Sequence, residues 1–66
     1  MLGKRTAKLR KERGWTQGDL ANATRLSRGY IASIEEGTVH PSIKTVAIIA
    51  KILGIEAGEL LKGEER

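Results

Sequence analysis

Short segments bounded by helix-capping residues dominate this sequence of 66 residues. A serine or threonine precedes three of them, at Thr16, Ser27 and Ser42. Glycine follows three, at Gly14, Gly37 and Gly54. A hydroxyl can accept hydrogen bonds from the first turn of a helix, and glycine readily ends one in the left-handed conformation. No run of alternating apolar and polar residues is long enough to predict a β-sheet. We therefore predict an all-α chain of five short helices over residues 4–12, 17–24, 28–36, 43–53 and 56–62.

Apolar residues recur within these segments at helical spacings and predict a single core. In the third helix Ile31 and Ile34 point inward, and in the second helix the inner side carries Leu20, Ala21 and Thr24. The predicted inner face of the fourth helix consists of Ile43, Val46, Ala47, Ala50 and Leu53. A chain of this length can build only one small core, so residues 1–66 form one domain, a compact bundle.

The residues that catalysis and metal binding usually require are scarce. The sequence has one histidine, one aspartate and no cysteine, which excludes disulfides, thiolate zinc sites and a set of nucleophile, base and orienting group. His40 lacks spaced metal-binding partners, so we interpret it as a loop residue or one near phosphate. We expect a protein that is not an enzyme and has no cofactor, metal or small-molecule ligand.

The longest mostly apolar stretch covers residues 46–55, well short of the roughly 20 residues that span a bilayer. No export leader is evident at the start of the sequence. We therefore expect a cytoplasmic protein with no membrane partner.

Charge is distributed unevenly along the chain, whose net charge is +4. Residues 1–28 hold eight basic residues against Glu12 and Asp19. Residues 56–66 hold four glutamates against Lys62 and Arg66, and we predict that the chain ends in an acidic tail over residues 62–66. This distribution favours binding to a polyanion, although solvated helix faces also produce it. The basic residues of the first helix have two open interpretations, contact with phosphates or a solvated surface: Lys4, Arg5, Lys8 and Lys11.

The second and third predicted helices are joined by a connection of only three or four residues. Two short helices joined this tightly cross steeply, which is the helix-turn-helix geometry. Ala21 is small enough to let the third helix cross close to the second. Because Ile31 and Ile34 face inward, Arg28, Gly29 and neighbouring residues lie at the outward amino end of the third helix, whose free N–H groups favour anions.

These residues resemble the phage-repressor/Cro, or XRE-type, helix-turn-helix domain. The resemblance rests on three motifs, LRKERGWTQGDLA, SRGYIASIEEG and PSIKTVAIIAKILGI, and extends from about Lys4 to Leu61. It implies a lambda-repressor-like fold in which the third helix is the recognition helix, lying in the major groove of double-stranded DNA. It also implies an internal ion pair between Arg10 and Glu35 and a core position for Trp15.

The resemblance further implies roles for individual residues in DNA binding. Four residues match or adjoin positions that read base edges: Arg28, Gly29, Tyr30 and Ser33. Arg28 is the strongest candidate, since a guanidinium can pair bidentately with guanine. Tyr30 alternatively packs against the turn. Phosphate contacts are expected from Thr16, Gln17, Ser27, Thr38 and Lys44, although Ser27 is foremost a helix cap.

Two departures from the family pattern concern backbone and reading positions. Arg25 stands where the family usually has a glycine in left-handed conformation, at a cost on the order of 1 kcal/mol. Gly29 and Ser33 offer little side chain for reading bases, so phosphate contacts would supply much of the affinity.

Isoleucines outside the predicted inner face raise the question of assembly. Ile48 replaces a residue that is usually polar, and Ile52 follows it four residues later. Ile52 either joins the core, with Ile48 a lone surface residue, or a two-fold interface forms from Ile48, Ile52, Ile55 and Leu61.

The sequence thus predicts a sequence-specific transcriptional regulator, a repressor-like homodimer on DNA. The alternative is an antitoxin or adaptor that uses the same scaffold to bind a toxin or another protein. The operator sequence and the sign of regulation are not readable from these residues.

Overall fold

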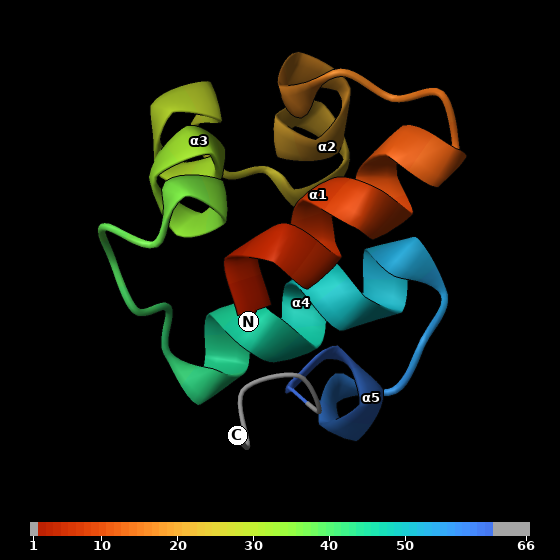
Figure 1. Ribbon diagram of the computed structural model, residues 1–66, viewed down its shortest axis with the longest axis vertical. Helices are drawn as coiled ribbons and strands as arrows, with labels where there is room; N and C mark the ends of the chain where they lie inside the picture. The colour runs from red at the N-terminus through yellow and green to blue at the C-terminus, as the bar shows by residue number, and fades with distance from the viewer. Residues whose placement is uncertain (1, 62–66) are drawn as a thin grey trace.

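Five helices make up the architecture, which the computed structural model describes for residues 2–61. They are α1 (Leu2–Glu12), α2 (Gln17–Thr24), α3 (Arg28–Glu36), α4 (Ile43–Leu53) and α5 (Ala57–Leu61). Helix α1 packs against α3 and α5, α2 packs against α3 and α4, and α4 packs against α5 (Figure 1). Residues 2–61 contain no strand, and none of their helices is long and apolar enough to cross a membrane. The predicted all-α fold is confirmed.

The predicted bounds of α2, α3 and α4 are confirmed, whereas those of the outer helices differ. Helix α1 begins at Leu2, two residues earlier than predicted, because Leu2 is buried at 4% exposure and adds its side chain to the core. Helix α5 begins at Ala57 rather than Glu56. The predicted end at Lys62 and the acidic tail of residues 62–66 lie outside the described residues.

Hydroxyl side chains begin the three middle helices as the sequence predicts. Thr16 Oγ1 accepts from the Asp19 N–H at 3.0 Å, and Asp19 Oδ2 accepts from the Thr16 N–H at 2.9 Å, a reciprocal capping box. Ser27 Oγ accepts from the Tyr30 N–H at 3.0 Å, and Ser42 Oγ accepts from the Thr45 N–H at 3.2 Å. Each cap satisfies a backbone donor that the helix itself leaves free.

The helix ends use left-handed residues. Gly37 and Gly54 end α3 and α4 with φ of 82° and 78°. Arg25 ends α2 with φ of 63° and is the one non-glycine residue of positive φ among residues 2–61. The left-handed turn expected at Arg25 is therefore present, and its side chain imposes a steric cost that glycine would avoid.

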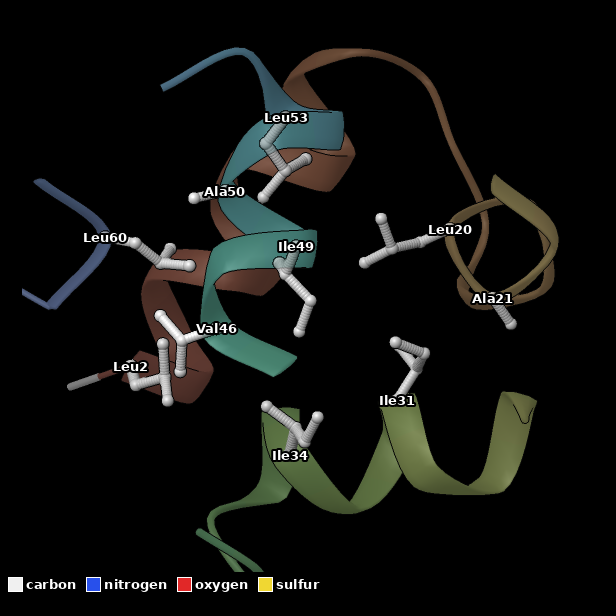
Figure 2. Packing of buried hydrophobic residues seen from close by; sticks show 10 residues of the cluster. All are labelled: Leu2, Leu20, Ala21, Ile31, Ile34, Val46, Ile49, Ala50, Leu53 and Leu60. Carbon is white, nitrogen blue, oxygen red and sulfur yellow. The ribbon is translucent and has the colours of Figure 1, made fainter. Parts of the chain in front are cut away.

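The core lies where all five helices meet. The side chains of Ile31 and Ile34 from α3 and Ile49 from α4 point toward one another (Figure 2). Burial of Leu20, Ala21 and Thr24 confirms the predicted inner side of α2. The apolar members of the core are Leu2, Leu20, Ala21, Ile31, Ile34, Val46, Ile49, Ala50, Leu53 and Leu60.

The predicted inner face of α4 is wrong at two positions. Ile43 is 76% exposed and Ala47 is exposed, whereas Ile49, which the prediction omitted, is fully buried. At about 100° per residue, the buried residues Val46, Ile49, Ala50 and Leu53 form one stripe. Ile43 and Ala47 lie about 70° and 110° from its centre, on one flank. The apolar face is therefore rotated toward Ile49.

Helix α1 meets α3 at a point where only glycine fits. A Cβ added at Gly3 would lie 2.6 Å from the Glu35 carbonyl oxygen and still closer to that of Ile34. Both obstacles are backbone atoms, which cannot move aside as the end of a flexible side chain can. Gly3 thus brings α1 into close contact with the last turn of α3.

Candidate nucleic-acid interface

The connection between α2 and α3 consists of Arg25, Leu26 and Ser27. The Leu26 N–H donates to the Ala21 carbonyl at 3.0 Å, which folds the chain back over the end of α2. Ala21 is only 4% exposed, and α3 packs directly against α2. The two helices therefore form a closely packed helix-turn-helix unit in which α3 begins at exposed residues.

The first turn of α3 presents an exposed surface beside the start of α2. Arg28 and Gly29 are exposed, and a Cβ added at Gly29 would contact no atom within 4 Å. Gln17, Arg28, Gly29 and Ala32 line one shallow hollow. The fold thus brings the predicted phosphate contact Gln17 next to two predicted base-reading positions. Ala32 was expected to point outward or sideways from this helix but was given no role in DNA contact, although its spacing from Arg28 puts it on the same helix face.

The other two candidate base-reading residues are less accessible. Tyr30 is half-buried and packs against the core. Ser33 is half-buried, and its carbonyl accepts the Thr38 N–H at 3.0 Å and the Thr38 hydroxyl at 3.2 Å. These hydrogen bonds hold the end of α3 to the loop that leads to α4. Arg28 and Gly29 are therefore the most accessible of the four candidates.

The candidate phosphate contacts occupy three separate places. Thr16 and Gln17 lie at the start of α2, and Ser27 is the exposed cap of α3. Thr38 and Lys44 are exposed in and after the connection between α3 and α4. All three hydroxyls among them already have roles in the fold, because Thr16 and Ser27 cap helices and Thr38 donates to the Ser33 carbonyl. Exposed Lys44 provides a cation at this surface.

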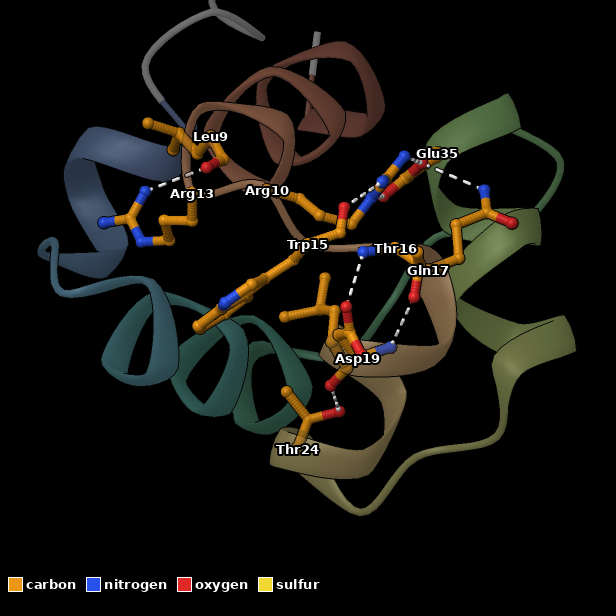
Figure 3. A network of polar contacts seen from close by, with 10 residues as sticks. Leu9, Arg10, Arg13, Trp15, Thr16, Gln17, Asp19, Thr24 and Glu35 are labelled. Atoms are coloured by element: carbon orange, nitrogen blue, oxygen red, sulfur yellow. Dashed lines mark hydrogen bonds and ion pairs between the residues drawn. The ribbon is translucent and has the colours of Figure 1, made fainter.

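A buried network lies directly behind Gln17. Arg10 Nε donates to Glu35 Oε2 at 2.7 Å and Arg10 Nη2 donates to Glu35 Oε1 at 2.9 Å, a bidentate pair whose side chains are 9% and 6% exposed. Arg10 Nη1 also donates to the Trp15 carbonyl at 2.7 Å, and half-buried Trp15 packs against the core. Gln17 Nε2 donates to Glu35 Oε1 at 3.0 Å, and its amide oxygen points away from Glu35 (Figure 3). One carboxylate therefore connects α1, α2 and α3.

The network changes the pKa of both charged partners. Burial alone would raise the pKa of Glu35, but hydrogen bonds from Arg10 and Gln17 and the charges of Arg10 and Lys11 together bring it below its ordinary value of 4.5. The hydrogen bond to Glu35 raises the pKa of Arg10, which outweighs the opposite effect of burial. Both groups are charged at neutral pH, so the pair is an ionic connection between α1 and α3.

A model of the helix-turn-helix family matches residues 7–60. That match covers α2, the turn and α3 together with most of the remaining bundle. The chain belongs to the helix-turn-helix family. Its fold is that of DNA-binding transcriptional regulators, of the XRE type that the sequence resembles.

Several relatives of this helix-turn-helix domain have been named. An immunity repressor protein of Bacillus phage phi105 is 42% identical over 64 residues, which are 97% of this chain and 44% of the relative. The transcriptional regulator DdrOP3 of Deinococcus deserti is 38% identical over 64 residues, 97% of this chain and 50% of the relative. The chain spans about half the length of these two relatives.

Solved structures of SinR resemble this helix-turn-helix domain closely. SinR, described as a master regulator for biofilm formation and crystallised with DNA, gives a TM-score of 0.87 at 31% identity, covering 92% of this chain and 98% of that chain. The SinR and SinI protein complex gives a TM-score of 0.90 at 29% identity, covering 98% and 64% of the two chains.

The candidate dimer residues of this helix-turn-helix domain are all half-buried. Ile52, Ile55 and Leu61 pack against the core, whereas Ile48 lies about 150° from the centre of the buried stripe of α4. Half-burial leaves part of each side chain accessible to a second molecule.

One structural role in the helix-turn-helix domain was missed from the sequence. Arg13, counted there only as a basic residue, donates from Nη1 to the Leu9 carbonyl at 2.9 Å and from Nη2 to the Leu53 carbonyl. It therefore supports the carboxyl end of α4. Its place two residues before Trp15 gave no signal of that distant contact.

Among residues 2–61 there is no group of three or more metal-binding side chains. His40 lies exposed in the loop after α3.

Proposed function

We propose that the chain is a sequence-specific transcriptional regulator that inserts the first turn of α3 into the major groove of double-stranded DNA. The observation that carries the proposal is the exposed hollow lined by Gln17, Arg28, Gly29 and Ala32. The guanidinium of Arg28 can bind a base edge, and the free N–H groups at the start of α3 can bind phosphate. The similarity to SinR, which was crystallised with DNA, supports DNA binding by this fold.

Within this function, Arg28 reads a base and Gln17 binds phosphate. Of the four candidate base-reading residues, only Arg28 combines an exposed position at the helix start with a guanidinium that can pair bidentately with guanine. Thr38 and Lys44, which are exposed beyond the carboxyl end of α3, bind the phosphate backbone of the DNA. Because Tyr30 packs against the core and Gly29 has no side chain, few residues choose the sequence and phosphate contacts supply much of the affinity.

Selection of bound sequences from random duplex DNA at physiological salt tests this function. We expect one enriched motif, and failure to enrich any motif would contradict sequence-specific binding. With that motif, Arg28→Ala should cost about 1–3 kcal/mol at one base position, whereas Gln17→Ala should weaken binding to all sequences alike. Equal losses on every sequence after Arg28→Ala would remove Arg28 from base reading.

The regulator acts as a repressor-like homodimer through Ile48, Ile52, Ile55 and Leu61, with half-sites about 34–36 Å apart. Ile48 on the outer flank of α4 supports this proposal, because an accessible apolar side chain there favours contact with a second copy. Sedimentation of the wild type should give a dimer and Ile48→Glu a monomer. If the wild type and Ile48→Glu both sediment as monomers, the proposed interface is wrong. A bacterial operator lies in the cytoplasm, so this function implies a cytoplasmic location.

A second candidate function is binding of a protein partner, as in an antitoxin or adaptor. The likeness to SinR in its complex with SinI favours it, since that scaffold was crystallised with another protein. Under this alternative the same isoleucine surface binds the partner. Two results together would favour this alternative over the regulator. A partner would co-purify with wild type but not with Ile48→Glu, and the selection would enrich no DNA motif.

A further inference from the structure

A row of lysines lies on α1, outside the helix-turn-helix unit. Lys4, Lys8 and Lys11 are all exposed and recur at spacings of four and three residues, which puts them on one face of the helix. Among residues 2–61, none of the three makes an ion pair or a side-chain hydrogen bond. The row therefore presents three available cations along one line.

These lysines line a shallow groove together with Ala7, Glu12 and Glu35. Small Ala7 leaves space between the lysine side chains. Of the two carboxylates, Glu35 already accepts the bidentate hydrogen bonds of Arg10, so its charge is neutralised locally. The groove consequently has an excess of positive charge and suits an extended polyanion.

The groove adjoins the proposed DNA-reading hollow. Glu35 lines the groove, Gln17 lines the hollow, and the two side chains share a hydrogen bond of 3.0 Å. A strand of DNA backbone that contacts Gln17 at the edge of the major groove is therefore next to the lysine row. From Lys4 to Lys11 the helix rises about 10 Å. Over about 10 Å of duplex axis, one DNA strand carries about three phosphates.

We infer that the face formed by Lys4, Lys8 and Lys11 binds the phosphate backbone of the DNA that flanks the site read by α3. This inference rests on the proposed DNA-binding function. It adds contacts that do not distinguish one sequence from another but extend the bound length of duplex beyond the base-reading helix.

The test measures affinity against salt concentration for the wild type and for the variant Lys4→Gln, Lys8→Gln, Lys11→Gln. Each phosphate contact contributes about 0.9 to the slope of log affinity against log salt, so the triple variant should reduce the slope by about 2.7. Lys8→Gln alone should reduce it by about 0.9. Lys51→Gln, which removes an exposed lysine from α4, is the matched control and should leave the slope unchanged.

Flank length provides the second measurement. Two duplexes carry the same enriched site, one ending at the site and one extended by about ten base pairs on each side, one helical turn. Wild type should bind the longer duplex more tightly, whereas the triple variant should bind both equally and keep the same base preference. Thermal unfolding of each variant identifies any loss that comes from misfolding.

The failures are distinguishable. If wild type enriches no DNA motif, the proposed function itself is wrong. If wild type enriches a motif but the lysine variants keep its salt slope and flank dependence, the inference about α1 is overturned. Loss of retention on immobilised polyglutamate by those same DNA-competent variants would then assign the row to an acidic protein partner.

Discussion

The side-chain amide of Gln17 donates a hydrogen bond to the same oxygen of Glu35 that accepts from Arg10 Nη2. The residue expected to contact phosphate is therefore held by the ion pair that joins α1 to α3. Such support limits the rotamers of a long polar side chain before DNA arrives, and this lowers the entropic cost of binding. The same carboxylate makes the fold sensitive to acid.

Protonation of Glu35 should lower stability. Burial disfavours its charge, but Arg10 and Gln17 keep the pKa of folded Glu35 below the ordinary 4.5. The unfolded chain therefore binds this proton at a higher pH than the folded chain does. The stabilisation is complete above pH 4.5 and is lost as pH falls through the lower, folded value. In urea unfolding from pH 7 to pH 3, the free energy of unfolding should fall less for Glu35→Gln than for wild type.

Exposed Glu36, the next residue, provides the control for that measurement. Glu36→Gln should retain the wild-type dependence on pH. If Glu35→Gln and wild type lose stability in parallel, the carboxylate of Glu35 is not the source of the acid sensitivity.

Arg25→Gly should raise the free energy of unfolding by about 1 kcal/mol. Arg25 has φ of 63°, and the steric strain of a Cβ in this region disappears with glycine. Ala23→Gly, at an exposed position within α2, is the control and should lower stability by about 1 kcal/mol. Chemical denaturation gives both values, and a loss in both variants would show that Arg25 makes a compensating contact.

Gly3→Ala should destabilise the fold by about 1–3 kcal/mol, because the new methyl group would overlap the carbonyls of Ile34 and Glu35. Gly29→Ala adds the same methyl to another helix in open space and should gain about 0.5–1 kcal/mol through helix propensity. Thermal unfolding of the two variants should therefore shift in opposite directions. Unchanged stability of Gly3→Ala would mean that α1 can move away from α3 at little cost.

The orientation of α4 has its own test. Ile49→Ala should cost about 2–5 kcal/mol because it leaves a cavity where the side chain is fully buried. Ile43→Ala, at 76% exposure, should change stability by less than about 0.5 kcal/mol. Similar losses from both substitutions in denaturant titrations would restore the inner face predicted from the sequence.

Capping residues made the middle of the fold predictable. Thr16, Ser27 and Ser42 each act through bonds to a residue three positions later, so local sequence carries the whole signal. The position of Arg25 in the turn was also predictable, because the family pattern has a glycine there. Both features depend on neighbours in the chain.

Long-range packing explains what was missed. Helix α4 has apolar residues on several faces, so spacing alone did not distinguish a stripe containing Ile43 and Ala47 from one containing Ile49. Contact with α2 and α5 decides between them. Gly3 and Arg13 likewise act on backbone atoms of residues more than thirty positions away, which no local pattern reports.

Arg10 pairs with Glu35, and Arg13 donates to the carboxyl end of α4. These internal contacts determine which basic side chains remain available to an approaching ligand. Arg10 and Arg13 serve internal contacts and Arg5 is half-buried, so the exposed basic residues of α1 are its three lysines. Lysine ammonium groups are compact, strongly hydrated point charges that impose little geometry. In the proposed complex they suit diffusional capture of DNA in many orientations, whereas the forked guanidinium of Arg28 would act only once the complex is aligned. Under the proposed function, early encounter with DNA and final recognition therefore depend on different basic side chains.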